Sequence, residues 1–126
     1  PFIASFIGSM NFIPVTIDSS KKVKCNSVEI NCDIGSFTEN DSVQLAVRPE
    51  EIHFQQENQD DNIISATIKE IEFLGSFQRV YFEAKSYTNE LIIVDVPSAS
   101  ARKIKLNIDE EMNLYFSKQD AHIYSN

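Results

Sequence analysis

Apolar and polar residues alternate with a period of two along most of the chain, which is the period of a β-strand and not of an α-helix. In 62–75 the alternation is regular up to Glu70, where the apolar side changes over, as it does at a β-bulge. The segments 77–84 and 90–96 are rich in aromatic and β-branched residues and are joined by the turn-like sequence SYTN. These three segments predict an antiparallel meander.

The remaining patterns predict short elements. The segments 112–116 and 121–124 read as strands, and a further strand should run up to Arg48. The segment 97–106 reads as a short helix that begins near Pro97 or Ser98 and has Ala101 and Ile104 on one side. Many short strands with little helix predict an all-β barrel or sandwich.

The chain is similar to itself, because the segment 40–54 aligns with the segment 109–123. A second similarity, with nearly the same spacing, places FIGSM (6–10) on FLGSF (73–77). A duplication would give two related halves, 6–54 and 73–124, packed as one unit. Chance similarity between β segments of the same period is the alternative. The first alignment, which we call the self-alignment, pairs Val43 with Met112, Leu45 with Leu114, Glu51 with Asp120 and His53 with His122.

Length and charge narrow the class of protein. A chain of 126 residues has the length of a single domain and is long enough to bury a hydrophobic core. Nineteen acidic against eleven basic residues give a net charge of -8, which disfavours nucleic acid as a partner. The three glycines are too few for a phosphate-cradling loop, and no serine lies in a nucleophile elbow. We therefore expect neither an enzyme nor a bound cofactor.

Metal ligands are scarce in this sequence. Cys25, Cys32, His53 and His122 are the only soft donors. The spacing of the two cysteines is neither that of a zinc site nor that of a disulfide framework. We expect no metal site and two reduced thiols, as in a cytosolic protein.

The sequence LAVRPEEIHF (45–54) predicts a corner at Pro49. Proline fixes its own φ, donates no backbone hydrogen bond and favours an extended conformation for Arg48, so the strand should turn at Pro49. Arg48 can return its guanidinium to a carboxylate such as Glu50, and a bidentate pair would fasten the turn. A corner held by this ion pair is one interpretation, and a surface that touches a partner is the other.

Several motifs resemble a known family. VQLAVRPEEI (43–52) resembles the Arg-Pro-Glu motif of the transport-associated OB-fold (TOBE) domain, which follows the ATPase domain in ATP-binding subunits of ABC importers. FIASFIGSMNFIP (2–14) is similar to the link into that domain, and IKEIEFLGSFQRVYFE (68–83) to its strand, Leu-Gly turn and strand. DVPSASARKIKL (95–106) and LYFSKQDAHIY (114–124) are similar to its closing part. The subgroup most resembled serves ferric iron, 2-aminoethylphosphonate or polyamine uptake.

The resemblance implies an all-β, OB-fold-like barrel with two related small β halves packed as one unit and one or two short helices. Residues 1–10 would end a linker from an ATPase domain that the chain lacks, and residues 11–126 would form the accessory domain. The expected interface and structural residues are those that match the family's motifs: Gly8, Asn11, Phe12, Arg48, Pro49, Glu50, Leu74 and Gly75.

The resemblance also implies a non-catalytic regulatory or scaffolding role in the ATP-binding subunit of an importer. Its partners would be the ATPase domain of the same polypeptide, a homodimer partner and, indirectly, the membrane permease subunits. ATP and Mg would bind only in the missing ATPase domain. The location would be cytoplasmic, peripheral at the inner face of the cell membrane as part of a transporter complex.

Two other functions stay open. A sensor for a small oxyanion or a transported substrate would gather Arg48, Arg79 and Arg102 around an anion, against the acidic overall charge. An oligonucleotide-binding barrel would need rings such as Phe77 and Tyr81 on a basic face, which the net charge of -8 opposes.

Overall fold

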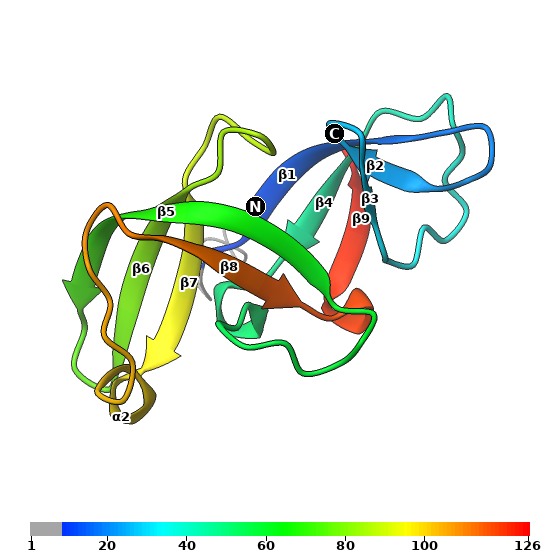
Figure 1. Ribbon diagram of the computed structural model, residues 1–126. Helices are drawn as coiled ribbons and strands as arrows, with labels where there is room; N and C mark the ends of the chain where they lie inside the picture. Colours follow the sequence, from blue (N-terminus) through cyan, green and yellow to red (C-terminus); the bar gives the residue numbers. More distant parts are fainter. Residues whose placement is uncertain (1–8) are drawn as a thin grey trace.

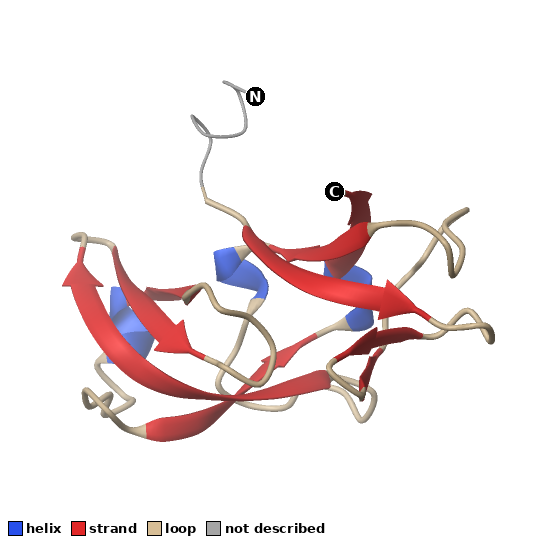
Figure 2. Cartoon of the chain, turned by 90° about the horizontal axis from the view of Figure 1, so that it is seen from above, coloured by secondary structure: helices blue, strands red, loops and turns tan. Residues whose placement is uncertain are grey.

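The computed structural model describes residues 9–126 and arranges their strands in two antiparallel sheets (Figure 1). The first sheet has the order β3-β2-β1-β4-β9 and the second the order β7-β6-β5-β8. The first contains β1 (Asn11–Ile17), β2 (Val23–Cys25), β3 (Val28–Ile30), β4 (Val43–Val47) and β9 (Ala121–Ser125). The second contains β5 (Asn62–Phe73), β6 (Phe77–Glu83), β7 (Ile92–Pro97) and β8 (Glu111–Phe116). The helices of residues 9–126 are short, namely η1 (Pro49–Glu51), α2 (Ser98–Ala101) and η2 (Lys118–Asp120), so the predicted all-β class is confirmed (Figure 2).

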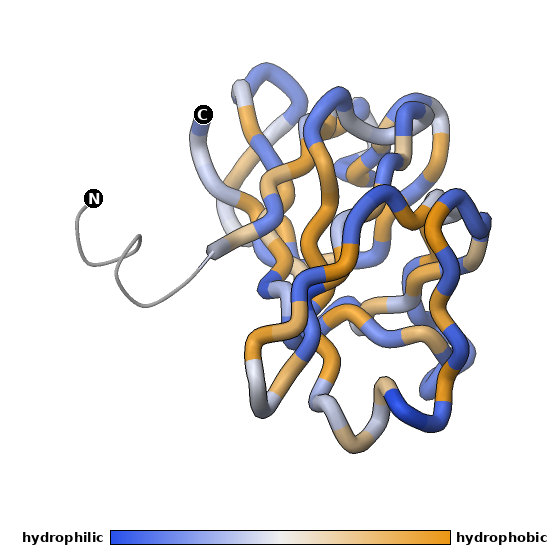
Figure 3. The backbone as a smooth tube through the Cα atoms, turned by 90° about the vertical axis from the view of Figure 1, so that its left-hand side faces the viewer, coloured by the Kyte–Doolittle hydropathy of each residue, from blue (hydrophilic) through white to orange (hydrophobic). Residues whose placement is uncertain are grey.

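The period of two in the sequence appears as alternating burial. Along β1, Ile13, Val15 and Ile17 are buried, while Phe12 and Pro14 face outward. Figure 3 shows the same short alternation of apolar and polar residues along the strands. One hydrophobic cluster contains buried residues from both sheets, so the two sheets are stabilised by a common core.

The first sheet curls until its outer strands meet. β3 and β9 lie at its two ends, and Asp33, shortly after β3, forms a parallel bridge with His122 of β9. Such closure satisfies backbone groups that would otherwise lie at an open sheet edge. The first sheet is therefore a small barrel, as the OB-like expectation requires.

The predicted meander is confirmed as β5, β6 and β7. The bulge is also confirmed, because the register of β5 against β6 shifts between Ile68 and Glu70. The predicted helix over 97–106 is too long, since α2 covers only Ser98–Ala101. Only Ala101 of this helix is buried, and the charged residues that follow it offer too little apolar surface to hold further turns.

The two sheets repeat one topology, because the order β3-β2-β1-β4 of the first matches the order β7-β6-β5-β8 of the second. The second repeat therefore begins with β5 at Asn62, and the predicted boundary at Phe73 lies instead at the end of that strand. Gly75 lies in the turn between β5 and β6, whereas Gly8 precedes β1 in the sequence and lies outside the described residues. The similarity of FIGSM to FLGSF thus does not relate equivalent positions.

The similarity of 40–54 to 109–123 does relate equivalent positions. The self-alignment carries η1 onto η2. After η1, His53 forms an antiparallel bridge with Tyr115 of β8; after η2, His122 lies opposite Ala46 of β4. The self-alignment also pairs Ala46 with Tyr115 and His53 with His122. In each half, the histidine that follows the 3-10 turn therefore pairs with a strand of the other half.

Two asparagines fasten the halves to each other. Asn11, the first residue of β1, donates to the carbonyl of Ile93 at 2.7 Å and accepts from its backbone N–H at 2.7 Å. Asn62, the first residue of β5, does the same with Asn31, at 2.9 and 2.7 Å. Ile93 lies in β7 and Asn31 follows β3, so both asparagines bind the edge of the opposite sheet. Each amide acts as one rung of a β-ladder, and we call these two contacts the asparagine latches.

Candidate functional site

The corner predicted at Pro49 is present in the structure. β4 ends at Val47, Arg48 is extended with φ -73° and ψ 144°, and Pro49 is the buried first residue of η1. The ion pair predicted within this corner is not formed, since Arg48 pairs with no carboxylate among residues 9–126. Proline and the extended strand restrict the backbone on both sides of the Arg48–Pro49 bond, and the Glu51 backbone N–H donates to the Arg48 carbonyl at 3.0 Å. The turn therefore forms without that ion pair. Arg48 and Glu50 are exposed.

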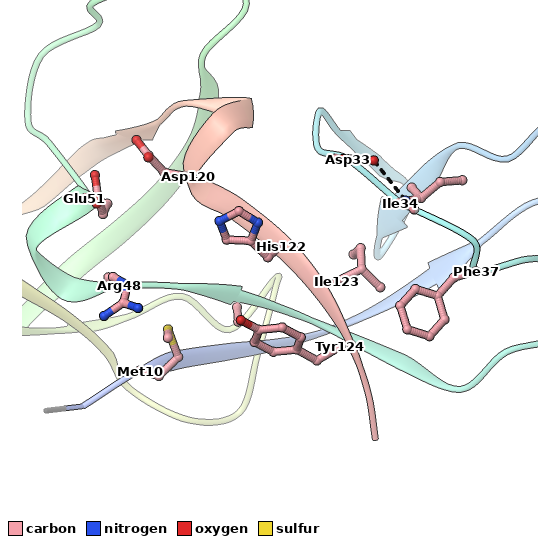
Figure 4. Close-up of a pocket in the computed structure, with 12 residues that line it drawn as sticks. Met10, Asp33, Ile34, Phe37, Arg48, Glu51, Asp120, His122, Ile123 and Tyr124 are labelled. Carbon is pink, nitrogen blue, oxygen red and sulfur yellow. Dashed lines mark hydrogen bonds between the residues drawn. The ribbon is translucent and has the colours of Figure 1, made fainter. Parts of the chain in front are cut away.

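Beside this corner lies a cavity of about 300 Å³ (Figure 4). It is formed by the chain before β1, the loop after β3, the end of β4, the two 3-10 turns and β9. Figure 4 shows Glu51 and Asp120 near each other, with His122 between them and Tyr124. Its lining combines charged and polar side chains with apolar ones, and it is open to solvent. The lining side chains include Met10, Ile34, Phe37, Arg48, Glu51, Asp120, His122 and Tyr124.

Two carboxyl groups of this cavity influence each other. Burial raises the pKa of Glu51, and the neighbouring Asp120 carboxyl group raises that pKa further. The negative charge of Glu50 acts in the same direction, and His53 opposes it. Glu51 and Asp120 are equivalent in the self-alignment, so the repeat brings two copies of one position together. Glu51 therefore holds its proton more tightly than a free glutamic acid side chain would.

The other predicted residues lie away from the cavity. Asn11 is buried in its latch with Ile93, and Phe12 is 43% exposed on the outward face of β1. Leu74, also 43% exposed, lies at the tip of the β5–β6 hairpin beside Gly75, whose φ of 85° favours glycine. Gly8 lies outside the described residues. The structure thus does not gather the predicted residues into one site, and their interface role stays a prediction.

The cysteines of the chain are free thiols, Cys25 buried and Cys32 half-buried. Burial raises the pKa of Cys32 to about 11, with a smaller effect of the Asp33 carboxylate, so this thiol is protonated near neutral pH. Residues 9–126 contain no group of three or more His, Cys, Asp or Glu side chains arranged to hold a metal ion.

Sequence reasoning missed the cavity, although it had one usable signal. The self-alignment pairs Glu51 with Asp120, and paired strand ends of a duplicated barrel often meet. His122 and Tyr124 carry no such signal, because their outward position on β9 depends on the pairing of β9 with β4. Asn62 was missed as well, since a polar residue at the start of a strand is ordinarily exposed.

The two curled sheets define the class of the protein as a small all-β, OB-fold-like domain with a repeated topology. The family model of the TOBE domain matches residues 45–123, and the chain belongs to this domain family. The match includes the Arg48 corner, the meander and the closing strand β9. The predicted family is therefore confirmed, and it is a non-catalytic one.

Two relatives are ATP-binding proteins of importers. The chain is 26% identical over 118 residues to the Fe(3+) ions import ATP-binding protein FbpC 2 of Rhizobium meliloti (strain 1021), covering 85% of this chain and 30% of the relative. It is 24% identical over 134 residues to the spermidine/putrescine import ATP-binding protein PotA of Trichodesmium erythraeum (strain IMS101), covering 95% and 34%. The chain thus spans about a third of the length of these curated relatives.

The fold has a solved counterpart. The structure is similar to that of the cytoplasmic molybdate-binding protein ModG with molybdate bound, with a TM-score of 0.69 and 9% sequence identity. The similarity covers 94% of this chain and 96% of the ModG chain, so both sheets take part in it. At this identity the likeness establishes the fold alone. Within residues 9–126 we find no helix long and apolar enough to cross a membrane.

Proposed function

We propose that this chain is a regulatory and scaffolding domain of the ATP-binding subunit of an ABC importer, and that it performs no catalysis itself. The observation that carries the proposal is the TOBE match over residues 45–123, together with relatives that are import ATP-binding proteins about three times as long. The additional length of such relatives is sufficient for a separate ATPase domain. ATP and Mg would bind in that domain.

The partners in this proposal are the ATPase domain of the same polypeptide, a second copy of the subunit and, indirectly, the permease subunits. The assembled subunit would lie in the cytoplasm at the inner face of the cell membrane. Exposed Arg48 and the half-exposed ring of Phe12 support contact with a partner, since arginine and aromatic side chains are enriched where protein surfaces meet. They also belong to the two motifs that the TOBE resemblance singles out.

Replacing Arg48 by Ala in the full-length protein tests this role. Because Arg48 is exposed and unpaired among residues 9–126, we expect the free energy of unfolding to change by less than about 0.5 kcal/mol. Subunit association should weaken by about 1–2 kcal/mol, or roughly tenfold in Kd, measured by analytical ultracentrifugation.

Arg102→Ala is the matched control, because Arg102 is also exposed and lies outside the corner. Unchanged association of Arg48→Ala, or equal losses for the two variants, would contradict the interface role. Hydrolysis of ATP by the 126-residue chain alone would contradict the non-catalytic role.

A second candidate function is the sensing of a small ligand, which the cavity beside Arg48 favours. The ligand that ModG is named for is an oxyanion. In this chain Asp33, Glu51 and Asp120 also line the cavity, and their carboxyl groups disfavour a small oxyanion. Calorimetric titration with molybdate, sulfate and a phosphonate is expected to be flat, and a saturable signal would establish oxyanion binding.

A further inference from the structure

The cavity beside the Arg48 corner holds a cationic group that no carboxylate of residues 9–126 neutralises. Arg48 lines the cavity and forms no ion pair with a carboxylate of residues 9–126. Its guanidinium offers a planar fork of N–H donors that matches a carboxylate or a phosphonate. The Tyr124 side chain lines the same cavity and adds a hydroxyl group.

The same cavity holds an anionic group. Glu51 from η1 and Asp120 from η2 both line it, and their side chains lie near each other (Figure 4). An ammonium group placed beside these two side chains could donate hydrogen bonds to both carboxyl groups.

The rest of the wall includes apolar surface. Met10, Ile34, Phe37 and Ile123 contribute a thioether, two branched side chains and a ring. Asp33 also lines the cavity and adds a third carboxyl group, whose Oδ1 accepts a hydrogen bond from the backbone N–H of Gly35 at 2.9 Å. The cavity therefore combines the Arg48 guanidinium, the neighbouring Glu51 and Asp120 carboxyl groups, the Asp33 carboxyl group and some apolar surface within about 300 Å³.

We propose that this cavity binds a small zwitterion of the amino-acid type, whose anionic group contacts Arg48 and whose ammonium group contacts Glu51 and Asp120. A dipolar ligand satisfies both charged groups of the site, while its short apolar side chain lies against Ile34 and Phe37. Burying either protein charge without an opposite charge from the ligand would cost free energy, so charge matching selects for the zwitterion.

Ligands with a single charge fit this site less well. An oxyanion would satisfy Arg48 but would lie beside Glu51 and Asp120. A diamine would satisfy the carboxyl pair but would bring its positive charge to Arg48. The inference deepens the ligand-sensing candidate of the preceding subsection and does not depend on the scaffolding role, so a flat titration would leave the association experiment unaffected.

Isothermal titration of the full-length protein with L-leucine and with 4-aminobutyrate tests the proposal, because these probes place their two charges at short and long separation. We expect saturable binding of at least one of them. For L-leucine, N-acetyl-L-leucine removes the ammonium charge and L-leucinamide removes the carboxylate, and each should bind at least tenfold more weakly. The oxyanion titrations serve as a second comparison.

Variants locate the binding. Arg48→Gln and Glu51→Gln should each weaken the zwitterion at least tenfold. Glu50→Gln and Arg102→Gln are the matched controls, since Glu50 and Arg102 are exposed and do not line the cavity. They should leave the affinity within about twofold, a change below the ~1 kcal/mol of one good polar contact. Circular dichroism verifies that each variant is folded.

Three results would overturn the proposal: no saturable signal with either zwitterion, equal binding of the acetylated or amidated probe, or unchanged affinity in both Arg48→Gln and Glu51→Gln. The site would be established if a zwitterion binds saturably, if the acetylated and amidated probes bind weakly, and if Arg48→Gln and Glu51→Gln weaken the zwitterion while the control variants do not.

Discussion

In the first half of the molecule β4 leads through Arg48 and Pro49 into η1, and in the second half β8 leads through Ser117 and Lys118 into η2. The backbone is nearly the same at both corners, with φ -73° and ψ 144° at Arg48 and φ -75° and ψ 147° at Ser117. The interactions that hold the two turns differ. The Ser117 hydroxyl accepts a hydrogen bond from the Gln119 backbone N–H at 3.1 Å, whereas the first corner has a proline that restricts the backbone.

This comparison separates folding from function at the corner. Since Ser117 forms the same turn without an arginine, the fold does not require the guanidinium of Arg48. The remaining difference between the halves is chemical: each corner presents a carboxyl group to the cavity, Glu51 or Asp120, and the first adds the cation of Arg48 where the second has Ser117. The repeated topology thus supplies two equivalent corners, and one substitution between them adds a positive charge beside two carboxyl groups.

The largest effect that tests the equivalence of the halves is expected in the core. Leu45 and Leu114 are paired by the self-alignment, and both are fully buried. Each Leu→Ala substitution should cost about 2–5 kcal/mol of unfolding free energy, because it removes buried methyl groups and leaves a cavity. Urea unfolding followed by circular dichroism measures both losses.

A single transition is expected for both leucine variants, since one hydrophobic cluster contains residues of both sheets. Two separate transitions, of which Leu45→Ala shifts only one, would show that the halves unfold independently. This result would contradict a common core.

The asparagine latches should give the next largest effect. Asn11→Ala or Asn62→Ala leaves one backbone N–H and one carbonyl of the opposite sheet without a partner, so we expect each to cost about 1–3 kcal/mol. Asn89→Ala is the control, because Asn89 is exposed in a loop and should change stability by less than about 0.5 kcal/mol. If one latch variant loses no more unfolding free energy than the Asn89 variant, that latch does not stabilise the fold and the two latches are not equivalent.

Much of the fold could be predicted from local patterns. The meander and its bulge follow from alternation over long strands, and the corner follows from one proline. The hairpin of β2 and β3 was missed, because strands of three residues are too short to show a period. Its turn uses Asn26 and Ser27 at φ 50° and 79°, which the sequence does not signal with a glycine.

The candidate site could be predicted only in part. Arg48 is identified by its motif, yet its expected ion pair with Glu50 depends on side-chain directions that alternation does not determine. The cavity joins residues from separate segments of the chain, and only the pairing of β4 with β9 brings His122 and Tyr124 beside Arg48. Contacts that depend on tertiary pairing leave no local pattern.

The two corners should respond to different substitutions by smaller amounts. Ser117→Ala removes the hydrogen bond to Gln119 and should cost about 0.5–2 kcal/mol. Pro49→Ala raises the conformational entropy of the unfolded chain and removes buried ring atoms, so we expect a loss of about 1 kcal/mol of unfolding free energy. Thermal unfolding measures both, with Glu50→Ala as the exposed control. A loss from Pro49→Ala no larger than that of the control would mean that proline does not set the first corner.

The smallest effect concerns the pH dependence of the carboxyl pair. The pKa of Glu51 is raised above its ordinary value of 4.5 in the folded chain, so the folded state binds this proton more tightly than the unfolded state does. The resulting stability is fully present below pH 4.5 and is lost as the pH rises through the higher folded pKa.

Glu51→Gln should remove this dependence and leave Asp120 with a neutral hydrogen-bond donor. The difference in unfolding free energy between the wild type and Glu51→Gln should therefore shift in favour of the variant as the pH rises from 4 to 8. Glu90→Gln serves as the control, since Glu90 is exposed and is not among the groups that act on the pKa of Glu51. Urea unfolding at a series of pH values measures it. A difference that is constant with pH would show that the pKa of Glu51 is not raised in the folded chain, and the two corners would then meet without electrostatic coupling.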